Sequence, residues 1–264
     1  MKIFETHAHY DDKRFDEDRD VLLGTQLKAG GIEYVINIAA DMSSVFTTDA
    51  LTKKYDYIYG ALGVHPEGIE DLTEEDMDRI AALVKENAKI RAIGEIGFDL
   101  SDGYPEKEVQ EKWFRRQIGL AKDLNLPIVV HSRDAAFDTF RVLSSEYTKK
   151  EGVINGIVHC FSYSVEEALK YTGIGFVIGV GGVVTFKNGR RLKETVRELS
   201  LNDMVLETDC PYLCPDPHRG ERNSSLYIPY IVKTIAQIKG VSEEEVCGAT
   251  MENAKRLFGI GING

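Results

Sequence analysis

The chain has 264 residues, of which 43% are hydrophobic and 28% charged, and it carries a formal net charge of −11 at pH 7. This composition predicts a globular protein with a sizeable core. The acidic balance excludes a protein that coats nucleic acid along its length, because phosphate neutralisation by Lys and Arg drives such binding.

No apolar run is long enough to predict a secretory signal or a membrane span. We therefore expect a cytoplasmic protein with reduced thiols. No linker, low-complexity tract or break in composition interrupts residues 1–264, which predicts a single domain. The four cysteines are dispersed, with no C-x-x-C pair: Cys160, Cys210, Cys214 and Cys247.

Short strand-like runs rich in Val, Ile and Gly alternate along the chain with helix-like stretches. Amphipathic spacing predicts helices over residues 16–29, 73–88 and 106–124. The second of them opens with Thr73 and has Asp76 three residues later, which resembles a capping box. In chain order, the strand-like runs are KIFETHAH, EYVINIAAD, YIYGALGVHP, IRAIGEIGFD, PIVVHS, NGIVHCF, GFVIGVGGVV and MVLETDC.

Eight strand-then-helix units predict a parallel sheet, because parallel neighbours need helical crossovers. A doubly wound open sheet could hold eight strands, but its chemistry gathers at one switch point. Here polar residues recur at strand ends throughout, and the spacing is even, which favours a closed TIM (β/α)8 barrel. The tail SEEEVCGATMENAKRLFGI predicts an additional helical pair on the outside of the barrel.

The histidines concentrate at the predicted carboxyl ends of the strands, where β/α barrels build their active sites. Glu95 on the fourth strand and Asp209 on the eighth take the same position. Any one of these residues alone is more often a hydrogen-bonded loop residue than a ligand. Together they favour a common site, because chance would have to bring nearly every histidine to this face. The histidines of the set are His7, His9, His65, His131 and His159, while His218 lies in the loop after the eighth strand.

His7 and His9 are two residues apart on a strand, so both side chains point to one face, here the barrel interior. Imidazole and carboxylate ligands suit Zn, Mn or Co, and Mg accepts the carboxylates. Six ligands are too many for one tetrahedral ion that keeps an open position. We therefore expect two divalent ions bridged by Glu95, which together can activate a water and stabilise the leaving oxygen.

Nine sequence blocks carry a resemblance to a known family. They lie in order between residues 4 and 260 and read ETHAHYDD, GVHPE, GEIGFD, LPIVVHSRDA, VHCFS, GGVVTFKN, LETDCPYL, RGERN and ENAKRLFGI. In this combination the chain resembles the TatD-like metal-dependent deoxyribonucleases of the amidohydrolase superfamily. The resemblance implies a TIM barrel with a binuclear metal centre.

The resemblance also implies how the ligands divide between the ions. One ion would be bound by His7, His9, Glu95 and Asp209, and the other by Glu95, His131 and His159. Asp209 would in addition act as general base toward the attacking water. Other superfamily members often bridge their ions with a carbamylated lysine on the fourth strand, but IRAIGEIGFD contains no lysine.

The chain departs from the pattern of this family at three places. Glu5 stands where family members usually have an aspartate, two residues before the first histidine of the pair. Leu100 follows GFD where an aromatic residue is common. The loop PDPHRGERNSS lacks the usual NEP ending. The last two departures concern substrate contacts and leave the metal ligands intact.

Cationic residues gather in the predicted loops at the same face, despite the acidic total. Loops after strands seven and eight commonly bind phosphate in barrels, and Arg recognises phosphate with two hydrogen bonds. Any one loop arginine is as often simply solvated, but the group favours a phosphate substrate over a neutral amide. The cations are Arg133, Lys187, Arg190, Arg191, Arg219 and Arg222, and the expected substrate contacts are His65, Arg133, Lys187, Arg219 and Asn223.

These features favour a phosphodiesterase, and the family resemblance implies, most concretely, a 3'–5' exonuclease on DNA with Asp209 and Glu95 as catalytic residues. The acidic total charge favours DNA that is short or bound by its end in the cleft, and we expect a monomer without membrane association. One alternative is hydrolysis of C–N bonds, as in deacylation of an amino-acid derivative, because the same centre can direct water at a carbonyl. A metal-dependent binding protein without catalysis is the third hypothesis.

Overall fold

Eight strands form one parallel sheet in which each strand pairs with the next along the chain. The computed structural model describes residues 1–261. The strands are β1 Ile3–Ala8, β2 Ile32–Ile38, β3 Ile58–Leu62, β4 Ile90–Asp99, β5 Ile128–Arg133, β6 Gly156–Val158, β7 Phe176–Val180 and β8 Met204–Leu206.

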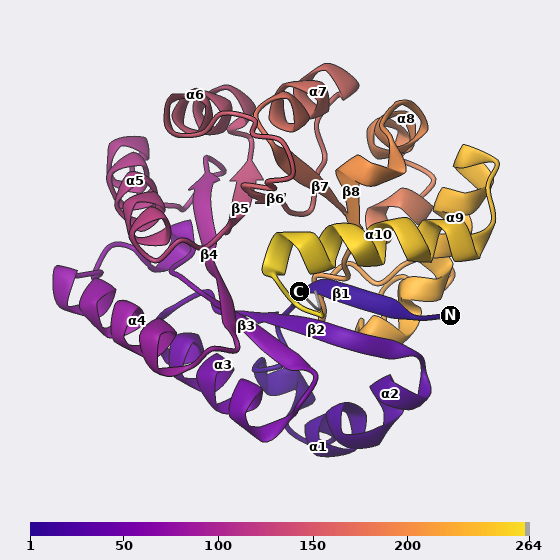
Figure 1. Cartoon of the computed structure of the whole chain (residues 1–264), viewed down its shortest axis with the longest axis horizontal. Helices are drawn as coiled ribbons and strands as arrows, with labels where there is room; N and C mark the ends of the chain where they lie inside the picture. Colours follow the sequence, from indigo (N-terminus) through magenta and orange to yellow (C-terminus); the bar gives the residue numbers. More distant parts are fainter. Residues whose placement is uncertain (262–264) are drawn as a thin grey trace.

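The sheet closes on itself where β1 meets the segment that follows β8. Ala8 forms a parallel bridge with Cys210. The N–H of Asp209 donates to the carbonyl oxygen of His7 at 2.9 Å, and the N–H of His9 donates to that of Cys210 at 2.8 Å. The TIM barrel predicted from the sequence is therefore confirmed (Figure 1).

Helices form a ring around the strands (Figure 1). The helices predicted over 73–88 and 106–124 are confirmed as α4 and α5, and Thr73 and Asp76 make the expected reciprocal capping box. The helices are α1 Arg19–Val21, α2 Leu27–Ala29, α3 Met42–Lys54, α4 Glu74–Glu86, α5 Lys107–Asp123, α6 Ala136–Glu146, α7 Val165–Gly173, α8 Arg190–Glu198, α9 Ile228–Lys239 and α10 Glu243–Phe258.

The first helical segment begins later than the sequence predicts. It starts at Arg19 rather than at residue 16, and a wider π-helical turn at Leu22–Gln26 joins α1 to α2. The guanidinium of Arg19 donates to the carbonyl oxygens of Tyr10 and Asp12 at 2.6 and 3.0 Å. These bonds tie the start of the helical segment to the turn after β1, ahead of a short 3-10 helix at Lys13–Phe15, and amphipathic spacing alone does not reveal them.

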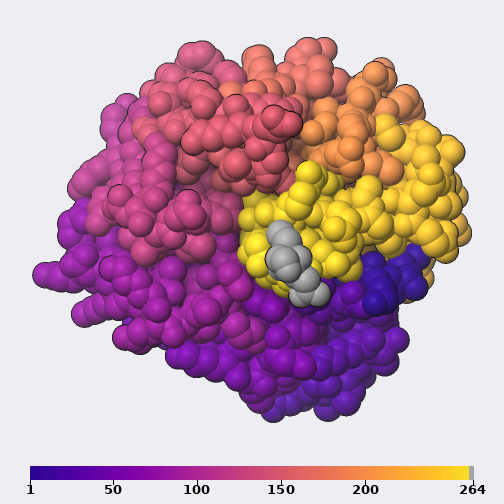
Figure 2. Space-filling model, viewed as in Figure 1, coloured from indigo at the N-terminus to yellow at the C-terminus, as the bar shows by residue number. Residues whose placement is uncertain are grey.

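The carboxyl-terminal helices pack on one another and cover one end of the barrel. α9 completes the ring as the helix that follows β8, and the tail 242–260 contains the single helix α10, Glu243–Phe258, rather than a pair. Ser242 caps α10 with a capping box to Glu245, and Gly259, in a left-handed conformation, ends it. α10 lies across the middle of the face seen in Figures 1 and 2.

Two apolar layers fill the barrel and its surround, and polar side chains gather at the carboxyl ends of the strands. Inside the barrel, strand residues such as Phe4, Val129 and Val205 pack with Leu257 and Phe258 of α10. A second, larger layer fills the space between the strands and the outer helices. Functional side chains therefore have room at the carboxyl ends of the strands. Over residues 1–261, no helix has the length and apolarity needed to cross a membrane.

Candidate metal centre

The structure brings the predicted ligands together at the carboxyl end of the barrel. Some lie within strands β1, β4 and β5, and the others lie in the segments directly after β1, β6 and β8. Closure of the barrel thereby joins residues that are up to about two hundred positions apart in sequence. The residues that meet are His7, His9, Glu95, His131, His159 and Asp209.

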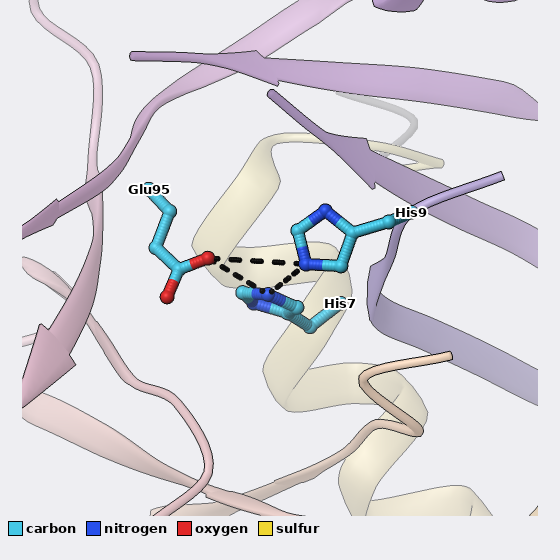
Figure 3. A group of neighbouring side chains, drawn as sticks. All are labelled: His7, His9 and Glu95. Atoms are coloured by element: carbon cyan, nitrogen blue, oxygen red, sulfur yellow. Dashed lines mark hydrogen bonds and ion pairs between the residues drawn. The ribbon is translucent and has the colours of Figure 1, made fainter. Parts of the chain in front are cut away.

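Glu95 stands between two groups of histidines and presents one carboxylate oxygen to each. Its Oε2 lies 3.4 Å from Nε2 of His7 and 3.9 Å from Nε2 of His9 (Figure 3). Its Oε1 lies 2.7 Å from Nδ1 of His131 and 2.6 Å from Nε2 of His159. The residue is only 4% exposed. This arrangement suits a carboxylate that ligates two ions at once.

Asp209 completes the group at Oε2 of Glu95. Its Oδ1 lies 3.3 Å from Nε2 of His9 and 3.7 Å from Nε2 of His7, and the two imidazole nitrogens are 3.2 Å apart. Two ligand atoms that each lie about 2.1 Å from one tetrahedral ion are roughly 3.4 Å from each other. The observed separations therefore fit atoms that share a divalent ion.

Two of the imidazoles have their ring nitrogens assigned by a second partner. Nδ1 of His9 lies 2.9 Å from the carbonyl oxygen of Ile38 and must carry the hydrogen, which leaves the lone pair of Nε2 for an ion. Nε2 of His131 lies 3.1 Å from Oδ2 of Asp99, which leaves the lone pair of Nδ1 on the side of Glu95. Such partners orient histidine ligands and raise their basicity. The donor set therefore fits a pair of divalent ions.

His65 differs from His9 and His131, because it turns an N–H rather than a lone pair toward the centre. The N–H of Glu67 donates to Nδ1 of His65 at 3.1 Å, so the hydrogen of the neutral ring is on Nε2. That nitrogen lies 3.9 Å from Oε1 of Glu95. Burial lowers the pKa of His65 to about 4, which keeps the ring neutral at physiological pH. His65 is thus better suited to donate to a bound substrate than to ligate an ion.

The electrostatics of the centre favour bound cations. Burial opposes ionisation of Glu95, but His159 and His131 outweigh it and hold its pKa well below the ordinary value. Burial likewise opposes ionisation of Asp209, and its hydrogen bond to His9 outweighs this and lowers its pKa. Burial disfavours the charged forms of His9 and His131, yet their carboxylate partners raise each pKa to about 9. Buried carboxylates of this kind need positive charge beside them, which divalent ions supply.

A cavity of about 750 Å³ opens above the centre. Two of the predicted substrate contacts, His65 and Arg133, line it, and Lys13 supplies a second cation. Carboxylates nevertheless outnumber cations in the lining, which includes Asp11 and Asp41. The cavity therefore offers cationic groups at single points rather than a continuous basic track.

The other three predicted substrate contacts do not line this cavity. Lys187 is exposed in the segment after β7, and the guanidinium of Arg219 lies over the ring of Phe186 at 4.3 Å. Asn223 is fully buried, and its Nδ2 donates to the carbonyl oxygens of Thr208 and Tyr212 at 3.1 and 2.7 Å. Asn223 therefore holds the loop that follows β8 instead of facing a ligand.

Sequence reasoning missed Asp99 and the two tyrosines of the cavity. Asp99 lies four residues after Glu95 on β4, so the period of two along a strand could have placed both on one face. Tyr104 and Tyr212 line the cavity. Tyr104 stands near His65, with ring centroids 6.0 Å apart, so an aromatic ring is present although Leu100 replaces the usual one. No local signal in the sequence predicts that Tyr104 supplies the aromatic ring that is missing at Leu100.

A (β/α)8 barrel that gathers histidines and carboxylates with the geometry of metal ligands around Glu95 is typical of a metal-dependent hydrolase. The sequence model described as TatD related DNase matches residues 4–259, and the chain belongs to this family. The resemblance noted in the sequence is therefore confirmed.

Individual relatives agree over nearly the whole length. The chain is 40% identical to the metal-dependent hydrolase YabD of Bacillus subtilis, with 98% of this chain and 99% of that protein covered. It is 32% identical to the metal-dependent hydrolase YcfH of Escherichia coli, with 98% and 97% covered. Among solved structures it is similar to YjjV, a TatD homologue from Escherichia coli, with a TM-score of 0.90, 27% identity and 98% of both chains covered.

Proposed function

We propose that this protein is a phosphodiesterase that uses two divalent ions, most concretely a 3'–5' exonuclease acting on DNA. The observation that carries the proposal is the position of Glu95, whose two oxygens face separate ligand groups. The same cavity presents the cations Arg133 and Lys13, which suit a phosphate group. The name of the family supports this choice of substrate.

The residues around the two ion positions would have two roles, to hold the ions and to accept a proton. Two divalent ions, when bound, would polarise the phosphoryl group and favour ionisation of a nearby water. His7, His9 and Asp209 would hold one ion, His131 and His159 the other, and Glu95 both. Because its pKa is lowered, Asp209 is ionised at neutral pH and would accept the proton that the attacking water loses.

Residues on the cavity wall would hold the scissile phosphate and its neighbours. Arg133 would form charge-assisted hydrogen bonds to phosphate oxygens, and Nε2–H of His65 would donate to another oxygen. Tyr104 and Tyr212 offer ring faces on which bases of a single strand could stack. The acidic residues of the lining would repel a long polyanion, which supports a short or end-bound DNA substrate, and we propose that the enzyme works as a monomer.

The proposal is tested with labelled oligonucleotides carrying the label at the 3' or the 5' end. Protein loaded with Mg, Mn, Co or Zn should release single nucleotides from the 3' end, and a blocked 3' end should stop the reaction. Asp209→Asn and Glu95→Ala should lose nearly all turnover. A wild-type protein that cleaves neither DNA nor a chromogenic phosphodiester with any of these ions would contradict the proposal.

The same assay distinguishes C–N hydrolysis as the alternative activity. Acylated amino acids are offered to the same metal-loaded preparations and compared with the oligonucleotides. Preferential deacylation that Asp209→Asn abolishes would assign the centre to amide chemistry. Absence of turnover on every substrate, with ions bound, would favour a binding protein.

A further inference from the structure

Glu5 is a fully buried carboxylate that lies at the seam where the barrel closes. It belongs to β1, two residues before His7, and it is the residue that departs from the family pattern in the first sequence block. It contacts neither the cavity lining nor Glu95 through any hydrogen bond found in residues 1–261. Its role therefore has to come from what its oxygens bind.

Four donors converge on this carboxylate from three segments of the chain. Oε1 accepts the backbone N–H of His7 and the backbone N–H of Thr208, both at 3.0 Å. Oε2 accepts the hydroxyl of Thr208 at 2.7 Å and the hydroxyl of Ser225 at 2.9 Å. Every one of these residues is fully buried. A buried carboxylate with four donors is well satisfied and holds them in fixed positions.

The two backbone donors are tied directly to ligands of the same ion. His7 is itself a ligand, and Thr208 immediately precedes Asp209. β1 and β2 lose their regular register between Glu5 and Ala8, where β1 advances three residues while β2 advances two. A bulge of this kind re-aims side chains and leaves a backbone N–H without a ladder partner. Glu5 accepts the N–H of His7 at this irregular stretch and so fixes the course of the chain there.

The hydroxyl donor Ser225 connects Glu5 to a second departure from the family pattern. Ser225 lies at the end of the PDPHRGERNSS segment after β8, which lacks the NEP ending usual in the family. The hydroxyl of Ser225 lies 2.7 Å from the hydroxyl of Tyr10, and the backbone N–H of Ser225 donates to the hydroxyl oxygen of Tyr10 at 2.9 Å. Glu5 and Ser225, which look unrelated in the sequence, thus belong to one buried network. The side chain of Glu5, longer than that of the usual aspartate, reaches the hydroxyl of Ser225.

We propose that Glu5 is a positioning residue that fixes His7 and Asp209 relative to one another and thereby sets the affinity of the His7–His9–Asp209 position for its ion. This inference rests on the proposed two-ion function. His131 and His159 make no hydrogen bond to this network within residues 1–261, so the ion that they would hold would be affected only indirectly, through the shared Glu95 and through the ring of His159, which stacks on that of His7 with centroids 3.9 Å apart. Loss of Glu5 should therefore weaken one ion selectively.

The test compares the two ion affinities of the wild type with those of Glu5→Ala and Ser225→Ala, using cadmium as the probe. Cadmium NMR gives one resonance for each bound ion, and His9→Ala and His131→Ala assign the resonances. Partners of this kind typically change metal affinity by about ten- to a hundredfold. We expect a loss of that size at the His7 position in Glu5→Ala, a smaller loss at the same position in Ser225→Ala, and little change at the other.

Two controls separate this effect from a general loss of stability. Glu111→Gln removes an ion pair between outer helices, so it should lower stability without changing either cadmium affinity. If Glu5→Ala does not fold, Ser225→Ala still removes one of the four donors with little change in volume. Equal weakening of both ions, or wild-type affinity at both in the two network variants, would overturn the inference. A wild type that binds no ion at the His7 position would instead contradict the proposed function.

Discussion

Asp99 and His131 form a hydrogen-bonded pair in which Nε2 of the ring lies 3.1 Å from Oδ2 of the carboxylate. The other nitrogen, Nδ1, lies 2.7 Å from Oε1 of Glu95. Gly97 between Glu95 and Asp99 allows this contact, because a Cβ there would overlap the carbonyl oxygen of His131. Asp99 therefore decides which nitrogen of His131 is available to an ion.

Removal of this partner should weaken the second ion. Asp99→Ala should lower the affinity of the His131–His159 position by about ten- to a hundredfold, the effect usual for a group that orients a histidine ligand. Competition with a chelator of known affinity measures the change. Ser101→Ala is the matched control, because Ser101 only donates to Asp99 and leaves the pair intact. Equal metal affinities in Asp99→Ala and wild type would refute this role.

Arg133 should contribute to substrate binding more than the cations that lie outside the cavity. Charge-assisted hydrogen bonds are worth about 1.5–3 kcal/mol, so Arg133→Ala should raise KM roughly ten- to a hundredfold. Steady-state kinetics on an oligonucleotide checks this, with Lys187→Ala and Arg219→Ala as comparisons. A larger effect in either comparison variant would place the phosphate site in the loops after β7 and β8, as the sequence predicts.

The ion pairs of Glu111 give a dependence of stability on pH that is independent of the metal centre. The guanidinium of Arg141 at 2.5 Å, together with Arg115, lowers the pKa of Glu111 to about 2. Because the carboxyl is a stronger acid in the fold, its stabilisation is complete above the ordinary pKa of a glutamate. It is lost as the pH falls toward the lowered value.

Glu111→Gln should therefore lower the free energy of unfolding by about 1 kcal/mol or less at neutral pH, as is usual for a partly exposed ion pair at the protein surface. Urea unfolding of variant and wild type gives the difference. The two proteins should converge in stability as the pH approaches the lowered pKa. A difference that grows on acidification would contradict the assignment.

Bound ions should stabilise the fold as well as support turnover. An ion that binds only the native protein adds roughly 2.7 kcal/mol when its free concentration is a hundred times Kd. Dialysis against a chelator should therefore lower the melting temperature, and readdition of Mn or Zn should restore it. Glu95→Ala serves as the comparison, because a variant that lacks the shared ligand and loses at least one ion should show a smaller shift. An unchanged melting temperature of the wild type after chelation would speak against ion binding at the centre.

The convergence of the candidate ligands could be predicted from the sequence because the barrel itself brings strand ends together. His7, Glu95 and His131 needed only the period of two along strands and the closure of the sheet. The helices α4 and α5 could be predicted for a related reason, since their caps and apolar spacing are local signals. These features depend on short stretches of sequence and on one common architecture.

The remaining features depend on side-chain contacts that carry no signal in the pattern of the sequence, some within one loop and some between distant segments. Asn223 binds the loop after β8 with its amide, and Arg222 pairs with Asp18 at 2.6 Å rather than reaching a substrate. Glu5 looks like an isolated departure until its hydrogen bonds to Thr208 and Ser225 are known. Asn223 takes its role from residues 11 and 15 positions away, whereas Arg222 and Glu5 take theirs from residues about two hundred positions away.

The claim that Glu95 joins two ions is tested most directly by the number of ions bound per chain. Equilibrium dialysis against Zn or Mn, followed by metal analysis, measures it for wild type, Glu95→Ala and Glu111→Gln. We predict two ions for wild type and Glu111→Gln, and loss of at least one for Glu95→Ala. A wild type that saturates with a single ion, or a Glu95→Ala variant that retains two with unchanged affinity, would contradict the account.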